Sequence, residues 1–189
     1  MTDLSDTEQH ATDLKAAYAD PPYLGCGSRY TEHHPDAMEW DQPERHAALV
    51  RELCDGYDCW AMSLSSPSLK TILPMCPDDC RVMAWVKPFA VFKPNVGVAY
   101  AWEPVIVRLC RKRTRQQATV RDWVSEVITL KTGLVGAKPA AFCWWLFDVL
   151  NLVPTDTLVD LFPGTGIMSR EWERFKRLEE AKPVRRLFA

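Results

Sequence analysis

Short apolar runs recur along this chain, separated by longer stretches in which apolar residues are spaced more widely. Runs rich in β-branched and aromatic residues, bounded by proline, glycine or charged residues, are typical of strands. The sequence predicts strands at residues 15–19, 59–64, 81–86, 101–108 and 157–162.

Amphipathic stretches with helical spacing separate these runs. Pro43 suits the first position of a helix, and Asp41 is a candidate cap for it. A helix that begins at Pro139 is apolar on nearly all sides, so it should be deeply packed. Helices are thus predicted at residues 43–54, 68–75, 139–150 and 167–178.

The order of these elements favours a largely parallel sheet with helices on both faces. Residues 81–86 are apolar on both alternating faces, which predicts a strand buried on both sides. Residues 24–42 are predicted to form a long loop, and residues 120–130 a helix or an irregular segment.

Length and composition fit one domain with a sizeable core. The chain has 189 residues, of which 47% are hydrophobic, and its formal net charge is −2. We expect a single domain at 14–180, between a flexible acidic lead (1–13) and a basic tail (181–189). The acidic N-terminus is unlike a signal peptide, and the most apolar stretch, 139–153, is too short to span a bilayer. The sequence therefore predicts a soluble, cytoplasmic protein that does not contact a membrane.

Seven cysteines are present, and most lie within apolar runs. Buried free thiols in a reducing compartment are the simplest interpretation, and we expect no metal. A zinc site is the alternative, with Cys76 and Cys80 joined by His33, His34 or His46.

The motif Asp20-Pro21-Pro22-Tyr23 follows the first predicted strand. In open α/β sheets, ligands bind at the carboxyl ends of strands. An aniline-like nitrogen is a poor nucleophile, and a carboxylate and a backbone carbonyl that accept its two N–H bonds would favour attack. Tyr23 offers a flat face on which an extruded base could stack. Taken alone, the motif is better explained as a turn that ends a strand.

A second motif, Asp160-Leu161-Phe162-Pro163-Gly164-Thr165-Gly166, joins the last predicted strand to the last helix. Glycines let the backbone approach a ligand closely, and a helix N-terminus attracts anionic groups. Ser169 breaks the Gly-x-Gly-x-x-Gly spacing, which argues against a dinucleotide site. By itself this motif is also compatible with a tight turn.

Together the two motifs resemble the permuted class of S-adenosylmethionine-dependent DNA amino-methyltransferases, in which the catalytic block precedes the cofactor block. The resemblance covers about residues 15–172 and implies a Rossmann-like methyltransferase sheet with helices on both faces. It implies a catalytic motif of Asp20, Pro21, Pro22 and Tyr23 that holds the target base. The implied cofactor-binding residues are Lys138, Asp160, Phe162, Gly164, Thr165 and Gly166.

Two departures from that family pattern shape the expectation. After Gly166 the family continues into a strand that ends in an acidic residue, which binds the ribose hydroxyls of the cofactor. Here a helix is predicted instead, and Glu171 or Glu173 could substitute for that residue. The sheet is therefore expected to be reduced at the cofactor-side edge. Either the cofactor affinity is lower, or a homodimer or a partner subunit completes the pocket. Only residues 109–137 could serve as a target-recognition region, so we expect weak specificity, or specificity supplied by a partner.

A basic segment lies in that region. Phosphate contacts and a solvated charged loop are both compatible with it, and its expected nearness to the site favours phosphates. Lys182, Arg185 and Arg186 of the tail could add to the same field. The candidate nucleic-acid contacts are Arg108, Arg111, Lys112, Arg113 and Arg115.

The expected function is S-adenosylmethionine-dependent methylation of an exocyclic amino nitrogen, most plausibly N6 of adenine in DNA. Tyrosine in the fourth place of the catalytic motif favours adenine within the family pattern. Two alternatives stay open. One is an inactive or partner-dependent subunit with the methyltransferase fold; the other is an enzyme acting on RNA adenine, on cytosine N4 or on a non-nucleic amine.

Overall fold

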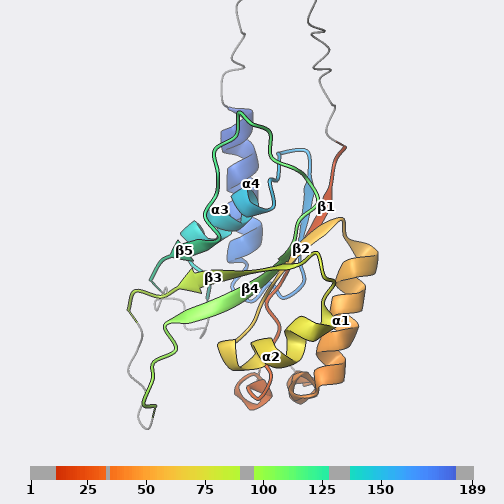
Figure 1. Cartoon of the computed structure of the whole chain (residues 1–189), viewed down its shortest axis with the longest axis vertical. Coiled ribbons are helices and arrows are strands. Elements are labelled where there is room, and N and C mark those ends of the chain that lie inside the picture. The colour runs from red at the N-terminus through yellow and green to blue at the C-terminus, as the bar shows by residue number, and fades with distance from the viewer. Residues whose placement is uncertain (1–11, 33–34, 90–95, 128–136, 182–189) are drawn as a thin grey trace, which may run out of the picture.

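The computed structural model of this chain describes residues 12–32, 35–89, 96–127 and 137–181. Its centre is a six-stranded sheet in the order β5-β3-β4-β2-β1-β6 (Figure 1). The strands are β1 (Lys15–Ala19), β2 (Cys59–Ser63), β3 (Arg81–Val86), β4 (Trp102–Arg108), β5 (Trp123–Ser125) and β6 (Thr157–Asp160).

One strand of the sheet is reversed. β1 pairs in parallel with both β2 and β6, and β3 pairs in parallel with β5. β4 is antiparallel to both of its neighbours, β2 and β3. The amino end of β4 therefore lies at the same edge of the sheet as the carboxyl ends of the other five strands.

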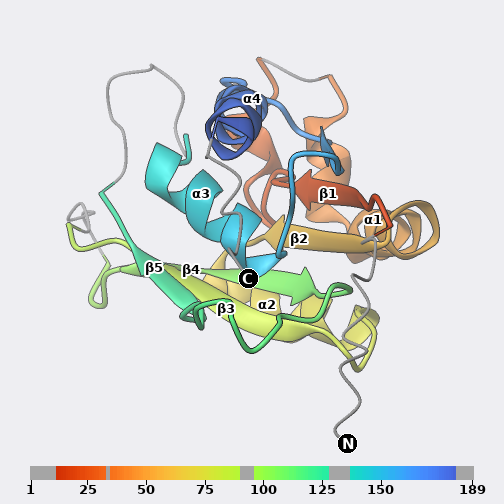
Figure 2. The same cartoon turned by 90° about the horizontal axis from the view of Figure 1, so that it is seen from above.

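Helices cover both faces of the sheet, as the sequence predicted. α1 (Pro43–Gly56) and the short α2 (Leu69–Ile72) lie on one face, and α3 (Ala140–Val149) and α4 (Ile167–Glu180) lie on the other (Figure 2). Strand residues alternate between two apolar cores, so Ala17 and Trp60 contact the α1 side whereas Ala16 and Tyr18 contact the α3 side. Short 3-10 helices complete the fold at Gly27–Arg29, Ala37–Asp41, Ser66–Ser68 and Leu73–Met75.

Most predicted elements are confirmed to within two or three residues, and the exceptions have physical reasons. Asp41 does not cap α1, because its carboxylate accepts the Gly27 backbone N–H (2.9 Å), and the cap position is Gln42. Residues 123–125 form strand β5, where a helix or an irregular segment was expected. These residues pair in parallel with the outer side of β3. Their own hydrophobic pattern does not encode this pairing.

The prediction that residues 81–86 are buried on both faces is wrong. Met83 and Trp85 pack under α3, whereas Val82 is 36% exposed and Arg81 is also exposed. β3 lies near an edge of the sheet, and α1 and α2 cover the opposite face mainly over β1 and β2. In the described part of the chain, no helix is long and apolar enough to cross a bilayer.

Candidate active site

The Asp20 motif lies where the sequence placed it, directly after β1. Tyr18 is the last residue of that strand to pair with β6, and Pro21 and Pro22 follow as buried residues without a backbone N–H. The strand therefore ends at this point. The Asp20 side chain stays 24% exposed at the carboxyl edge of the sheet.

The Asp20 carboxylate belongs to a connected cluster with four other charged and polar side chains. The Lys138 ammonium donates to Asp20 Oδ2 at 2.6 Å, and its side chain is only 4% exposed. The Tyr23 hydroxyl lies 2.9 Å from Glu103 Oε2 and 3.1 Å from Asp20 Oδ1, so its single hydrogen serves one of them at a time. Lys87 forms an ion pair with Glu103.

Opposing charges set the protonation of this cluster. Burial raises the pKa of Asp20, and the Lys138 ammonium only partly opposes that rise. Burial acts in the same direction on Glu103, but Lys138 and Lys87 lower its pKa overall. Burial alone would lower the pKa of Lys138, whereas the carboxylates of Asp20 and Glu103 raise it. Lys138 therefore stays charged, and Asp20 is the carboxylate that takes up a proton more readily.

The glycine turn lies beside this cluster because β6 pairs with β1. Asp160 is the register partner of Tyr18, and the Leu161 N–H donates to the Tyr18 carbonyl at 2.9 Å. Gly164 and Gly166 have φ angles of 46° and 70°, a region that favours glycine. A Cβ atom on Gly164 would meet only the Phe162 carbonyl, at 3.8 Å, so the turn has open space on that side.

Asp160 is the ionisable group of the turn. Its carboxylate accepts the Phe162 N–H at 3.2 Å, and burial raises its pKa to about 6. The Asp20 carboxylate contributes to the same rise. A cation placed beside Asp160 would reverse this shift, so the residue is suited to an ammonium group.

The remaining predicted cofactor residues have other contacts. Phe162 packs edge-on against Trp40, with ring centroids 5.1 Å apart. The Thr165 carbonyl accepts a hydrogen bond from Arg170 of α4 at 2.6 Å, which holds a guanidinium over the glycine turn. Lys138 was expected to bind the cofactor, and its amine forms an ion pair with Asp20.

The basic segment lies at the opposite edge of the sheet from Asp20, so its predicted nearness to the site is wrong. Arg108 is at the carboxyl end of the reversed strand and pairs with Asp79. Arg111 binds the Asp156 carboxylate with both guanidinium nitrogens, at 2.6 and 2.7 Å. It therefore holds the start of β6 in place, because Asp156 immediately precedes that strand. Lys182, Arg185 and Arg186 lie outside the described residues.

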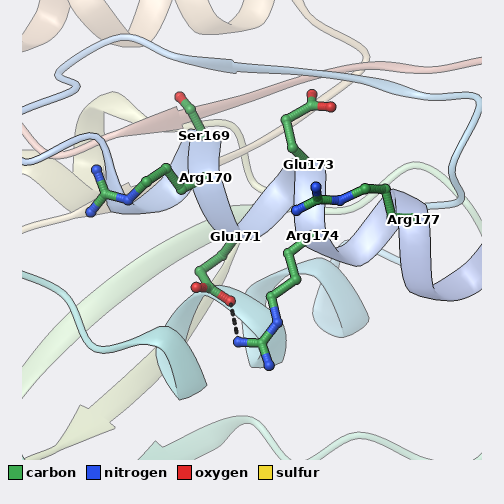
Figure 3. A pocket seen from close by; sticks show the side chains of 6 residues that line it. All are labelled: Ser169, Arg170, Glu171, Glu173, Arg174 and Arg177. Atoms are coloured by element: carbon green, nitrogen blue, oxygen red, sulfur yellow. Dashed lines mark ion pairs between the residues drawn. The ribbon is translucent and has the colours of Figure 1, made fainter.

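The two glutamates proposed as substitutes for a ribose-binding residue lie on α4, along a shallow surface hollow (Figure 3). Glu171 accepts the Trp144 indole N–H at 2.6 Å and pairs with Arg174 at 3.6 Å, which fastens α4 to α3. Glu173 pairs with Lys176 at 2.6 Å on the exposed side. Neither residue follows a strand at the site edge, so that role is not supported.

The alternative zinc site is not formed by the residues that the structure describes. Burial raises the pKa of Cys76 to about 12 and that of Cys80 to about 11. His46 instead bonds the Trp40 carbonyl at 2.9 Å. No group of three or more metal-ligating side chains occurs in the described ranges, and His33 and His34 lie outside them.

Comparison with known proteins identifies the fold. The sequence matches no protein-family model and no curated protein. Among solved structures, the M1.HpyAVI–SAM complex superposes with a TM-score of 0.53 at 15% identity, covering 87% of this chain and 79% of that one. TTHA0409 from Thermus thermophilus, named as a candidate DNA modification methylase and complexed with S-adenosyl-L-methionine, gives 0.51 at 17% identity, covering 87% and 78%.

These similarities define the class of fold. This chain, a mixed α/β sheet of six strands with helices on both faces, matches the fold of S-adenosylmethionine-dependent methyltransferases. At 15–17% identity they show the fold, and the chemistry has to be argued from the side chains of the site.

Sequence reasoning missed three residues of the site: Glu103, Lys87 and Arg170. Glu103 lies near the start of β4 and reaches the site edge only because that strand is reversed. Lys87 directly follows β3 and is paired with the Ala101 carbonyl at 2.8 Å through its backbone N–H. A charged residue beside Pro88 and another beside Pro104 are signals that could have marked the first two.

Proposed function

We propose that this protein is an S-adenosylmethionine-dependent methyltransferase that methylates the exocyclic amino nitrogen of a nucleic-acid base, N6 of adenine in DNA. The observation that carries the proposal is the juxtaposition of Asp20 and the Gly164 turn on neighbouring strands. Residues about 140 positions apart in the sequence become adjacent at one edge, where this fold binds its ligands. The shared fold and the Asp-Pro-Pro-Tyr motif support the same assignment.

The residues of the turn fit the amino-acid end of the cofactor. Asp160 would pair with its ammonium group, and the open backbone at Gly164 would face its carboxylate, with Arg170, beside Gly166, adding positive charge. When bound, S-adenosylmethionine supplies an activated methyl group on a sulfonium centre. Its methyl group would then have to face the Asp20 cluster for transfer in line.

Asp20 is placed to orient the acceptor and to take its proton. Each carboxylate oxygen can accept more than one hydrogen bond, so Asp20 can bind an amino N–H while Lys138 and Tyr23 stay in place. The nitrogen gives up one proton after it gains the methyl group. Because burial raises the pKa of Asp20, this carboxylate can receive that proton.

The rest of the cluster controls the availability of Asp20. Lys138 holds the carboxylate in one orientation, and it also competes with the substrate amine for the same oxygen. Glu103 draws Lys138 in the other direction, at 3.7 Å, and accepts from the Tyr23 hydroxyl. The balance between the two carboxylates should therefore set how readily a base amino group reaches Asp20.

The product of the reaction is the decisive measurement. Purified protein is incubated with methyl-labelled S-adenosylmethionine and either DNA or RNA, and the nucleosides are then separated. We expect label in N6-methyldeoxyadenosine. Label in N4-methylcytosine or in RNA adenosine would replace the proposed substrate, and no label in any nucleoside would leave the inactive or partner-dependent subunit as the better assignment.

Exchanging Glu103 for glutamine should slow transfer. Glu103→Gln removes the carboxylate that draws Lys138 away from Asp20, so Lys138 should bind Asp20 more strongly and lower its pKa. We expect a fall of about 10- to 100-fold in kcat, with the acidic limb of the pH profile moved to lower pH. Glu52→Gln, on the exposed side of α1, is the matched control. An unchanged pH profile in Glu103→Gln would contradict this role.

Cofactor affinity should depend on pH through Asp160. Its pKa of about 6 means that the carboxylate loses its charge as the pH falls below that value. Titration calorimetry at pH 5 to 8 should therefore show S-adenosylmethionine binding that weakens by up to about tenfold per pH unit below 6. Asp160→Asn should bind weakly across the whole range. If the Asp160→Asn variant retained the wild-type pH dependence, that dependence would have to arise from another group.

A further inference from the structure

A second surface hollow, of about 540 Å³, lies at the far edge of the sheet from Asp20. It is formed by the start of β3, the segment between β4 and β5, and the end of α3. Six Lys or Arg side chains and one carboxylate, that of Asp122, line it. The six cationic residues are Arg81, Arg111, Lys112, Arg113, Arg115 and Arg121.

The positive charge of this hollow is local and only partly compensated. The whole chain carries a formal net charge of −2. Within the hollow, Arg111 is neutralised by Asp156 and Arg81 lies 3.8 Å from Asp122. Lys112 and Arg115 are exposed, and their side chains form no ion pair or hydrogen bond with other described residues. A polyanion is therefore the class of ligand that this surface attracts.

The loop that carries these charges is held in place, although it contains no helix or strand between Leu109 and Asp122 (Figure 1). Arg113 donates to the Ala118 carbonyl at 3.0 Å and to the Asp148 carbonyl at the end of α3. The Gln117 side chain bonds the Thr114 N–H at 2.8 Å and Asn151 Oδ1 at 2.7 Å. Because these contacts fix the backbone, Lys112 and Arg115 are presented without a large ordering cost on binding.

We propose that this basic hollow is a docking surface for the phosphodiester backbone of a nucleic acid, separate from the site that receives the base. α3 runs from the Lys138 end of the site towards the hollow, and its ten residues span about 15 Å. The hollow therefore binds phosphates several nucleotides away from the methylated base. The choice of a polynucleotide over other polyanions rests on the proposed function. The positive charge of the surface is observed independently of that function.

Phosphate contacts at this surface explain how the chain could hold DNA with so little sequence available for base readout. Contacts with the backbone position a nucleic acid but carry no sequence information. Binding through the hollow should therefore be strongly salt-dependent and insensitive to base composition. It would raise the local concentration of bases near Asp20 without selecting among them.

Fluorescence anisotropy of the full chain with a labelled 20-nucleotide oligo(dT) tests the proposal. This probe has no exocyclic amino group and the assay contains no cofactor, so its outcome does not depend on methyl transfer. The test variant is Lys112→Gln/Arg115→Gln. The control, Arg51→Gln/Arg177→Gln, removes the same charge from exposed positions on α1 and α4.

We expect the wild type to bind with a log–log salt slope that the test variant reduces by about 1.4, or about 0.7 for each lost phosphate contact. Affinity at 100 mM NaCl should fall about tenfold in the test variant and less than twofold in the control. Three results would overturn the proposal: no binding by the wild type, equal losses in the two variants, or displacement of the probe by poly-glutamate as effective as that by unlabelled oligo(dT). The last result would assign the hollow to an acidic polypeptide.

Discussion

Asp20→Asn should lower the rate of methyl transfer by about 10³-fold or more while the protein stays folded. The amide cannot take a proton from the acceptor nitrogen, and it presents an acceptor to one N–H only. Asparagine is preferable to alanine because its amide oxygen can still accept from Lys138, whose side chain is only 4% exposed. An alanine would leave that ammonium beside an empty space.

Single-turnover transfer with labelled S-adenosylmethionine measures the effect, and calorimetry measures cofactor binding in the same preparation. Cofactor affinity should change by no more than a few-fold, since Asp160 and the glycine turn are untouched. Asp55→Asn, on the exposed side of α1, is the matched control and should keep full activity. Full activity in Asp20→Asn would refute the proposed chemistry, whatever substitutions of the other residues show.

Asp156→Asn should destabilise the fold by about 3–5 kcal/mol, a typical cost of breaking a buried ion pair. The Asp156 side chain is fully buried and accepts four hydrogen bonds, from Arg111 at 2.6 and 2.7 Å and from the Leu14 and Val153 N–H groups at 2.8 and 2.7 Å. An amide can accept on one side only, so donors on the other side lose their partner. Urea unfolding measures the difference.

Asp79→Asn is the internal comparison for that experiment. Asp79 pairs with Arg108 at 3.1 Å, but its side chain is 57% exposed, so its loss should cost less than about 1 kcal/mol. The pKa of Asp156 is lowered in the folded protein, so its contribution is present above the ordinary carboxylate pKa and disappears as the pH falls through the folded value. Equal effects of the two substitutions, or a difference between them that persists in strong acid, would contradict this account.

The sequence predicted most of the elements and the two motifs of the candidate site because these depend on local patterns. β1 was predicted at its observed bounds, Lys15–Ala19, since prolines after Asp20 cannot continue a strand. The glycine turn was recognisable because positive φ angles at Gly164 and Gly166 need residues without a Cβ.

The positions of the charged residues were not predictable in the same way. A charged side chain carries no signal for its partner, so Lys138 was linked to the cofactor although its ammonium binds Asp20. The direction of β4 decides two further outcomes. It brings Glu103 into the cluster and takes Arg111 to the far edge, and the hydrophobic pattern of a strand does not encode its direction. Arg111 consequently proved to be a structural residue.

The pairing of β1 with β6 also has a consequence for how the chain folds. These two strands are the most distant in sequence of any pair in the sheet, yet Ala16 lies opposite Leu158. Contacts between remote segments carry a high loop-closure cost and tend to form slowly. During synthesis, β2, α1 and β4 can pack together while β1 still lacks its partner on the other side. The two halves of the site would thus be assembled in a late step, after residue 160 has left the ribosome.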